Sequence, residues 1–255
     1  MSELSADRSF DELVDEGSSA GLEGWDFSFL HGRAVTEPLP WSYQQLAADL
    51  VGTARRTLDV DTGGGEVFSS LRPPPGSIAV EPYEPNVAVA ARRLGPLGIH
   101  VLARPTDALP VGDAMFDLVL NRHGWLDVRE TYRVLTPGGR LLSQQVGARN
   151  DVELNEALGL PVPVGSVAPS AVDVVAQDLE RAGFAPRAVR EAVVVTRFLD
   201  VGAVVFQLRA VPWQAPGFDI VRHRGHLRRI HDEILRTGGF EVRSQRFLIQ
   251  ARKPA

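Results

Sequence analysis

The segment from Leu58 to Glu66 constrains the fold of this chain more than any other. A short apolar run carrying Asp59 and Asp61 leads into three consecutive glycines, Gly63 to Gly65, and a helix-like EVFSSL stretch follows. This order predicts a strand, a tight turn and a helix N-terminus, where the backbone can approach a nucleoside-bearing ligand closely. Glu81 ends the next apolar run about 20 residues on, the spacing at which a Rossmann-type sheet places a carboxylate for ribose hydroxyls.

The glycine spacing distinguishes between two classes of nucleotide site. The three glycines do not fit the G-x-G-x-x-G pattern of a dinucleotide site, and a plain loop turn is the alternative interpretation of such a cluster. The pattern Asp59-x-Asp61-x-Gly63-x-Gly65 resembles the D-x-G-x-G-x-G first motif of class I S-adenosylmethionine-dependent methyltransferases. In this chain Asp61 takes the position of the first motif glycine.

The segments after Glu81 follow the order of the same superfamily. A helix is expected over residues 86–94, strands over 99–103, 116–121 and 141–146, and an amphipathic helix over 125–135. The run Arg133 to Leu142 carries an R-V-L-x-P-G-G-x-L signature, in which Pro137 and the glycines end the helix and turn the chain into a strand. The resemblance implies an α/β fold, with a Rossmann-like seven-stranded sheet and helices on both faces.

The superfamily resemblance also implies a cofactor, S-adenosyl-L-methionine, and a set of binding positions. Glu81 would hold the ribose and Asp107 the adenine amino group, and the glycine turn with Asp61 would hold the methionine part. The expected cofactor-binding residues are Asp59, Asp61, Gly63, Gly65, Glu81, Asp107 and Asn121.

Nearly the whole chain is similar to a bacterial family of small methyltransferase-like proteins. The similarity is carried by GGGE, RH and QQVG segments and by aromatic segments near residues 25–33, 40–43 and 212–218. Gly124 stands where this family leads us to expect a glutamate. Asp61 could pair with the cofactor's α-ammonium, or it could repel the methionine carboxylate or block the pocket. A carboxylate in a dry cleft also tends to gain a raised pKa and become a usable base.

Composition is that of a single enzyme domain. With 255 residues, 44% of them hydrophobic, the chain can bury a sizeable core. The formal charge of −5 argues against a general nucleic-acid binder, and the absence of cysteine excludes disulfides and thiolate chemistry. No window approaches the ~18 apolar residues of a membrane span. We expect a cytoplasmic protein with a small-molecule substrate and no membrane or nucleic-acid partner; homo- and hetero-oligomers both stay open.

The chain divides into segments by composition. Residues 1–21 are polar and acidic and are expected to be disordered. Residues 22–255 form one methyltransferase-like domain, in which 22–56 is an N-terminal cover and 57–146 is the cofactor-binding core. Residues 199–240 are a helical insertion before the last strand, and insertions of this kind usually shape the substrate pocket.

The chemistry is expected at the ends of the fourth and fifth strands. His123 titrates in the range of a general base, although a structural histidine bonded to backbone is an equal alternative. Asp61 is the second catalytic candidate. His223, His226 and His231 lack a carboxylate cluster, so no metal site is expected. The substrate is expected to lie against Trp25, Arg33, Trp41, Tyr43, Arg122 and Trp213.

Three functions remain open on the sequence. The first is an S-adenosylmethionine-dependent methyltransferase acting on a small molecule, in secondary metabolism such as antibiotic biosynthesis. The second keeps the fold without methylation and catalyses a cofactor-free elimination or intramolecular cyclisation of the aziridine-forming type, with Asp61 or His123 as base. The third is a non-catalytic partner of an active enzyme.

Overall fold

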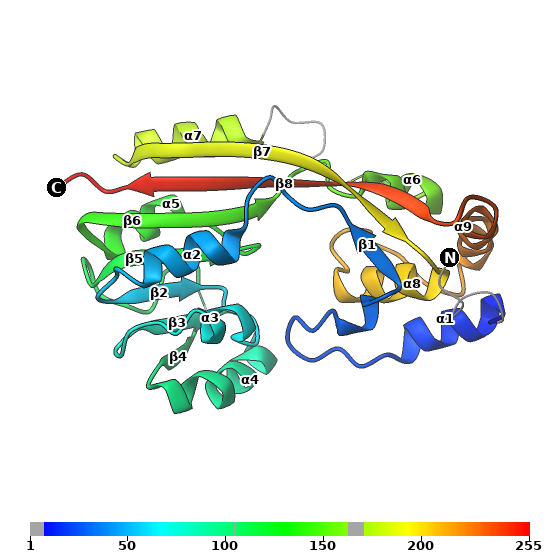
Figure 1. Cartoon of the computed structure of the whole chain (residues 1–255), viewed down its shortest axis with the longest axis horizontal. Helices are drawn as coiled ribbons and strands as arrows, with labels where there is room; N and C mark the ends of the chain where they lie inside the picture. The colour runs from blue at the N-terminus through cyan, green and yellow to red at the C-terminus, as the bar shows by residue number, and fades with distance from the viewer. Residues whose placement is uncertain (1–7, 105, 163–170) are drawn as a thin grey trace.

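The computed structural model describes residues 8–104, 106–162 and 171–255 and is built on one mixed sheet (Figure 1). The strands follow the order β1-β7-β8-β6-β5-β2-β3-β4. The five from β6 to β4 run parallel, whereas β8, β7 and β1 are antiparallel to their neighbours. The strands are β1 (Ala34–Thr36), β2 (Thr57–Val60), β3 (Ile78–Glu81), β4 (His100–Ala103), β5 (Phe116–Arg122), β6 (Leu135–Val146), β7 (Ala185–Phe198) and β8 (Phe240–Arg252).

The predicted α/β sheet is confirmed, with one strand more than the seven expected. The additional strand is β1, a three-residue segment of the N-terminal cover that pairs with the edge of β7. Its pattern is too short to be recognised as a strand without the neighbour it pairs with. Strand β6 is longer than expected, since it begins at Leu135 rather than Leu141, and β8 begins at Phe240, the last residue of the expected helical insertion.

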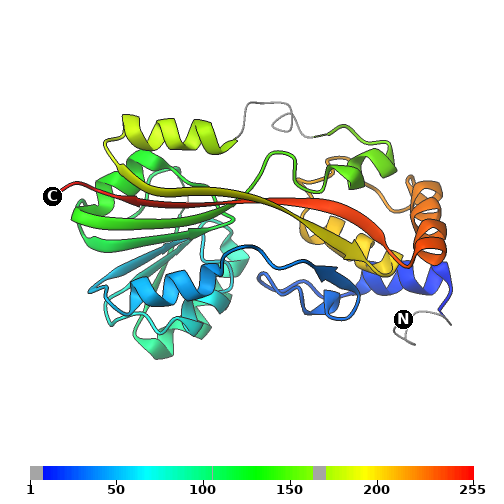
Figure 2. The same cartoon turned by 45° about the horizontal axis from the view of Figure 1, so that its top comes forward.

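Helices cover both faces of the sheet (Figure 2). The alternation of side chains along each strand supplies an apolar surface on each side. In β5, Leu118 and Leu120 pack with α2, whereas Val119 packs with α5. One face carries α5 (Val128–Val134) and α7 (Ala171–Arg181), and the other carries α2 (Tyr43–Val51), α3 (Glu66–Ser70) and α4 (Glu84–Leu94), which continues into η2 (Gly95–Leu97).

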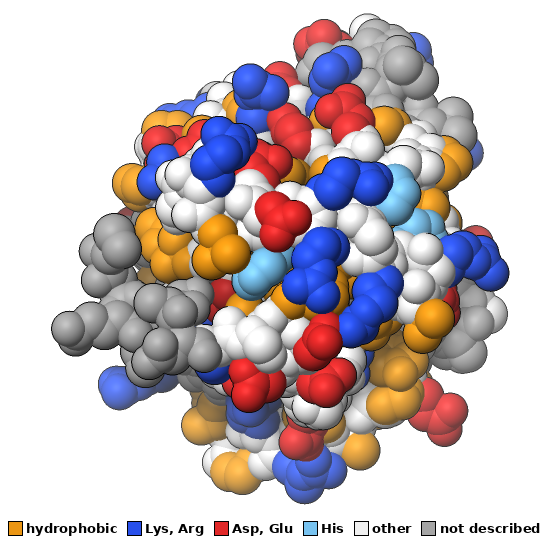
Figure 3. All heavy atoms as spheres, turned by 90° about the vertical axis from the view of Figure 1, so that its right-hand side faces the viewer, with side chains coloured by type: hydrophobic (Ala, Val, Ile, Leu, Met, Phe, Trp, Pro, Cys, Tyr) orange, Lys and Arg blue, Asp and Glu red, His pale blue; other side chains and the backbone are white. Residues whose placement is uncertain are grey.

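The long strands β7 and β8 extend past the core to a second hydrophobic cluster, which we call the helical lobe (Figure 1). The parallel strands end on the side that faces this lobe, where ligands of open α/β sheets bind. The lobe consists of α1 (Phe10–Ser19), η1 (Ser28–Leu30), α6 (Val152–Leu158), α8 (Val201–Ala210) and α9 (Arg224–Thr237). Acidic and basic side chains alternate over its outer end, without a field of one sign (Figure 3).

The expected disorder of residues 1–21 is wrong for the part that the structure describes. Ser9 and Glu12 form a reciprocal capping box that starts α1. Phe10, Leu13 and Val14 are buried in the helical lobe. The segment is polar on average, but its apolar residues are spaced to form one face of an amphipathic helix. Residues 1–7 lie outside the described residues. The insertion at 199–240 does contain two helices, but α8 is a buried part of the lobe's core.

None of the helices in the described part of the chain is long and apolar enough to cross a membrane.

Candidate functional site

The glycine turn between β2 and α3 has the backbone that the sequence predicts. Gly63 and Gly65 have φ values of 62° and 79°, in the left-handed region that favours glycine. The amide of Thr62 donates to the carbonyl of Val80 at 3.1 Å, so the turn begins alongside the end of β3. The turn is thus fixed at the carboxyl edge of the parallel strands.

Glu81 holds the glycine turn against β3. One carboxylate oxygen accepts the N–H of Gly63 at 2.6 Å, and the other accepts the N–H of Tyr83 at 2.9 Å. Glu81 is only 3% exposed, so burial raises its pKa while these two backbone hydrogen bonds oppose the rise. The predicted ribose-binding carboxylate therefore lies at the turn and already orders its backbone.

Asp61 and Gly124 form one structural unit. Asp61 has a φ of 59°, and its carboxylate lies 3.1 Å from the guanidinium of Arg104 and accepts the N–H of Trp125 at 2.6 Å. A Cβ added to Gly124 would lie 2.4 Å from the Cβ of Asp61. The side chain at position 61 therefore occupies the space that a side chain at position 124 would need. Burial raises the pKa of Asp61, and Arg104 opposes this rise.

Asp59 lies buried beside this unit at the end of β2. Its pKa is raised to about 7, mainly by burial and also by the neighbouring charges of Asp61 and Glu81, while the hydroxyl of Thr62 and the charge of Arg122 oppose the rise. Asn121 is fully buried at the end of β5. Its amide donates to the carbonyl of Val60 at 3.1 Å and its oxygen accepts from the hydroxyl of Ser143, so it links three strand ends.

Aromatic side chains lie over the glycine turn and connect it to the helical lobe. Trp25 stacks on Phe27 with ring centroids 6.0 Å apart and meets the edge of Trp213 at 5.7 Å. Phe27 in turn contacts Phe206 of α8. We call these four residues the aromatic cover. The structure thus brings Trp25 and Trp213, both predicted from the sequence, to the same place.

The space above the glycines tests whether an adenosyl group fits here. A Cβ on Gly63 would lie 2.1 Å from Cδ1 of Trp25, and one on Gly64 would lie 2.3 Å from Oε1 of Glu66. The ends of side chains, not backbone, therefore fill the space. Trp25 is 42% exposed, so its indole is not locked in a core and can turn aside. The backbone and Glu81 fit an adenosyl group, and displacement of Trp25 provides the room.

A second group of predicted residues is joined by Gln144. Its side-chain oxygen accepts the indole N–H of Trp41 at 2.8 Å, and its nitrogen lies 3.0 Å from Nε2 of His123. Because the oxygen already accepts, the nitrogen donates to His123, and the imidazole carries its proton on Nδ1. His123 has a φ of 59°, and its pKa lies well below the usual value because protein surrounds the ring and Arg122 and Arg246 repel a further proton.

Arg122 and His123 lie at the carboxyl end of β5, beside the end of β6. Both residues keep exposed surface, yet the surrounding protein lowers the pKa of each. The guanidinium of Arg122 lies 5.9 Å from the ring centre of Tyr43, which is buried beneath it. The charge of Asp59 also raises the pKa of Arg122, so Arg122 and His123 lie near the glycine turn.

Two predicted residues stand apart from these groups. Arg33 makes a bidentate contact with Asp200, with both N···O distances at 2.7 Å, and also pairs with Glu16. Its charge is therefore used to hold the helical lobe together. Asp107 is exposed in the loop after β4.

Two residues of the site, Arg104 and Arg246, were not predicted from the sequence. Arg104 follows β4 and Arg246 lies in β8, and only the pairing of strands across the sheet brings each to the site. Gln144, in the QQVG segment at the end of the fifth expected strand, was among the candidate polar groups there, without an assigned role. Its spacing from Arg122 and His123 could have indicated one, since neighbouring parallel strands bring their ends together.

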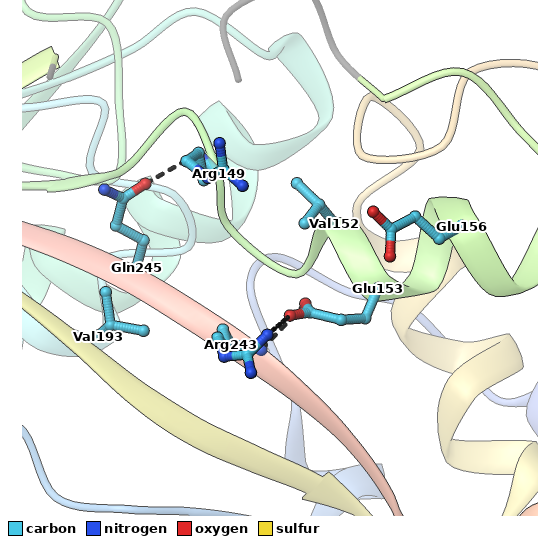
Figure 4. A pocket seen from close by; sticks show the side chains of 7 residues that line it. All are labelled: Arg149, Val152, Glu153, Glu156, Val193, Arg243 and Gln245. Carbon is cyan, nitrogen blue, oxygen red and sulfur yellow. Dashed lines mark hydrogen bonds and ion pairs between the residues drawn. The ribbon is translucent and has the colours of Figure 1, made fainter. Parts of the chain in front are cut away.

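A shallow pocket of about 170 Å³ lies elsewhere, between α6, β7 and β8 (Figure 4). Arg243 pairs with Glu153 at 2.9 Å, and the side-chain oxygen of Gln245 accepts the backbone N–H of Arg149. These four polar residues of the pocket are thus bonded within the protein, and we assign the pocket no role.

Comparisons with known proteins agree with the fold. A family profile described as a methyltransferase domain matches residues 58–143. A candidate methyltransferase from Bacillus halodurans is 19% identical, with a TM-score of 0.58 over 83% of this chain and 99% of its own. The YcgJ protein of Bacillus subtilis is 21% identical, with a TM-score of 0.57 over 84% and 98%. The [4+2]-cyclase SpnF is 19% identical, with a TM-score of 0.52 over 83% and 80%. No curated protein sequence matches.

The chain therefore shares the fold of these methyltransferases, and its residues 58–143 match a methyltransferase domain, with the glycine turn near the start of the matched segment. The narrower resemblance to a bacterial family of small methyltransferase-like proteins stays a prediction.

Proposed function

We propose that this protein is an S-adenosylmethionine-dependent methyltransferase acting on a small molecule. The observation that carries the proposal is the glycine turn itself. Two left-handed glycines and a buried Glu81 bonded to the turn lie within the segment that matches a methyltransferase domain, and the half-exposed indole of Trp25 covers them. A role in secondary metabolism is part of the same proposal.

In this proposal Gly63, Gly65 and Asp61 contact the methionine part of the cofactor, and Glu81 the ribose. S-adenosylmethionine, when bound, supplies an electrophilic methyl group on a sulfonium. The chain's own task is to align the acceptor with that methyl group and to exclude water, because positioning alone can supply much of the rate. Trp25 and Trp213, closing over the turn from the helical lobe, would exclude the water.

His123 is the candidate proton acceptor for an acceptor group that must lose a proton. Its Nε2 accepts a hydrogen bond from Gln144, so proton transfer to this nitrogen requires Gln144 to turn away. The lowered pKa keeps the imidazole neutral at pH 7, which is the form that a base needs.

A second function is favoured by one observation, the position of Asp61. Its carboxylate is paired with Arg104 and packed on Gly124, in a strand-end space beside the glycine turn. In a cofactor-free elimination or ring closure, this carboxylate would take a proton from a bound amine or hydroxyl while an arginine stabilises the departing anion. The same fold also serves a cyclase, SpnF, so the fold alone does not decide between the two chemistries.

Calorimetric titration with S-adenosylhomocysteine separates the two functions. The methyltransferase proposal predicts saturable binding by the wild type that Glu81→Gln weakens at least about tenfold, since a charged hydrogen-bond acceptor is lost. Trp25→Ala would retain binding, because the indole only covers the turn. The matched control is Glu241→Gln, an exposed glutamate of β8 far along the sheet. Absence of heat at millimolar ligand, with activity lost in Asp61→Asn, would reject the first function in favour of the second.

A further inference from the structure

Arg122, Gln144 and Arg246 share one face of the sheet. Cross-strand pairing places Arg122 opposite Gln144 and Gln144 opposite Leu248. Directly paired residues point to the same side, as do residues two apart along a strand, so Arg246 joins them. Leu248 packs in the same cluster as Tyr43. The common face is therefore the α2 face, at the open ends of β5 and β6.

The two guanidiniums on this face have no ion-pair partner among the residues that the structure describes. Within the described part of the chain, neither Arg122 nor Arg246 has a carboxylate within 4.0 Å, whereas Arg33 and Arg104 are both paired with aspartates. Among the described residues, Arg246 donates only to neutral acceptors, the amide oxygen of Asn150 and the carbonyl of Gln245.

The nearest carboxylates do not neutralise these cations. Asp151 attracts Arg246 from beyond ion-pair distance. Its own oxygens accept from the hydroxyl of Ser244 at 2.6 Å and the amide of Asn150 at 2.8 Å. Asp59 attracts Arg122 in the same way.

Surrounding protein and mutual repulsion work against both charges. The pKa of Arg122 and that of Arg246 are lowered, in each case mainly by burial, and the pKa of Arg246 is lowered further by the charge of Arg122. Two like charges on one face of the sheet repel each other, and an anion placed between them offsets that repulsion. His123 lies beside them and carries its proton on Nδ1, so it supplies a further donor.

We propose that Arg122 and Arg246, with His123, bind an oxyanion group of the substrate: a carboxylate, sulfate or phosphate. The assignment to a substrate rests on the proposed function, because it takes the glycine turn as the cofactor site. It restricts the acceptor to anionic small molecules, and it places their charged end over β6, to the side of the turn.

Titration of the full chain with sodium sulfate against sodium chloride at equal ionic strength tests the anion site. Guanidinium Nε–H signals followed by NMR should shift for Arg122 and Arg246 and saturate. Arg246→Gln and Arg122→Gln should each weaken sulfate binding at least about tenfold, as expected for a lost charged hydrogen bond. Arg246→Lys, which keeps the charge, should lose less. Arg236→Gln, an exposed arginine of α9, should change nothing.

The proposal is overturned if the wild type and Arg246→Gln bind sulfate equally, or if the shifts appear at other arginines. Circular dichroism and urea unfolding of each variant exclude loss of the fold as the cause. Titration of Arg246→Gln with S-adenosylhomocysteine separates the two sources of an anion. Unchanged affinity supports a substrate anion, whereas an equal loss would assign the site to the methionine carboxylate and reject this proposal. Sulfate binding without any binding of S-adenosylhomocysteine by the wild type would reject the proposed function alone.

Discussion

Asp59, Asp61 and Glu81 bring three carboxyl groups to two neighbouring strand ends, and each is held differently. Glu81 bonds to two backbone amides, Asp61 pairs with Arg104, and Asp59 has the most strongly raised pKa of the three, at about 7. The surroundings therefore shift the pKa of Asp59 the most, because its buried carboxyl group lies near the other two.

Asp59 makes stability depend on pH. Its folded pKa of about 7 lies above the unfolded value of about 3.9, so between these values the folded state holds a proton that the unfolded state has lost. Stability should therefore fall as pH rises toward 7 and level off above it. From pH 5.5 to 8 the expected loss is about 2 kcal/mol, from roughly 1.5 pH units at 1.36 kcal/mol each.

Urea unfolding at the two pH values measures this loss. Asp59→Asn removes the titrating group and should remove most of the difference. Asp113→Asn, an exposed carboxylate, is the control and should leave it. An unchanged pH dependence in Asp59→Asn would contradict the assignment of the raised pKa to this residue.

The contact between Asp61 and Gly124 predicts strong coupling between two substitutions. Gly124→Ala should cost about 1–3 kcal/mol of unfolding free energy, because the new Cβ meets Asp61 at a distance that real atoms do not adopt. In an Asp61→Gly background the same change should cost close to nothing. Chemical unfolding of the four proteins in this double-mutant cycle gives the coupling energy. Equal costs in the two backgrounds would show that the space above Gly124 is not filled by residue 61.

At the scale of elements, α1 and α8 approach one another through glycine. A Cβ on Gly17 would lie 2.2 Å from the carbonyl oxygen of Gly202, and one on Gly202 would lie 2.4 Å from the carbonyl oxygen of Leu13. This contact joins the N-terminal helix to the helix that carries Phe206 of the aromatic cover. The position of Trp25 over the turn thus depends on how closely two helices of the lobe pack.

Gly17→Ala should therefore destabilise the protein, although replacing glycine by alanine in a helix usually stabilises it. Alanine in an ordinary helix position is about 1 kcal/mol more favourable than glycine. Here the collision with backbone should outweigh that gain and leave a net loss of about 1–3 kcal/mol, measured by chemical unfolding. Gly21→Ala, which meets nothing within 4 Å, is the matched control. A stabilised Gly17→Ala protein would mean that α1 does not pack on α8 in this way.

For the whole molecule, the sequence was informative where local pattern and topology coincide. Spacing indicated the glycine turn and Glu81, and the resemblance to class I methyltransferases indicated the succession of strands, because strand ends of a Rossmann-like sheet have fixed neighbours. What could not be predicted depends on contacts across long sequence separations. Arg33 is committed to Asp200, α1 folds because the helical lobe buries its apolar face, and Arg246 reaches the site only through the register of β8 with β6.

The same long-range contacts link the two parts of the molecule. The helical lobe is tied to the sheet by β7 and β8 and by the aromatic cover, which ends on Gly63. A ligand at the glycine turn should therefore change the backbone dynamics of two segments. One is the turn itself, and the other is the segment of the N-terminal cover that carries Trp25.

Amide hydrogen exchange with and without S-adenosylhomocysteine reads out both sides in a single experiment. The structure predicts that saturating ligand slows exchange at residues 62–66 and 81–83, where the turn and Glu81 would meet it, and speeds exchange at residues 24–27, where Trp25 is displaced. Unchanged exchange at residues 62–66 in the presence of millimolar ligand would contradict the account of the glycine turn as a cofactor site.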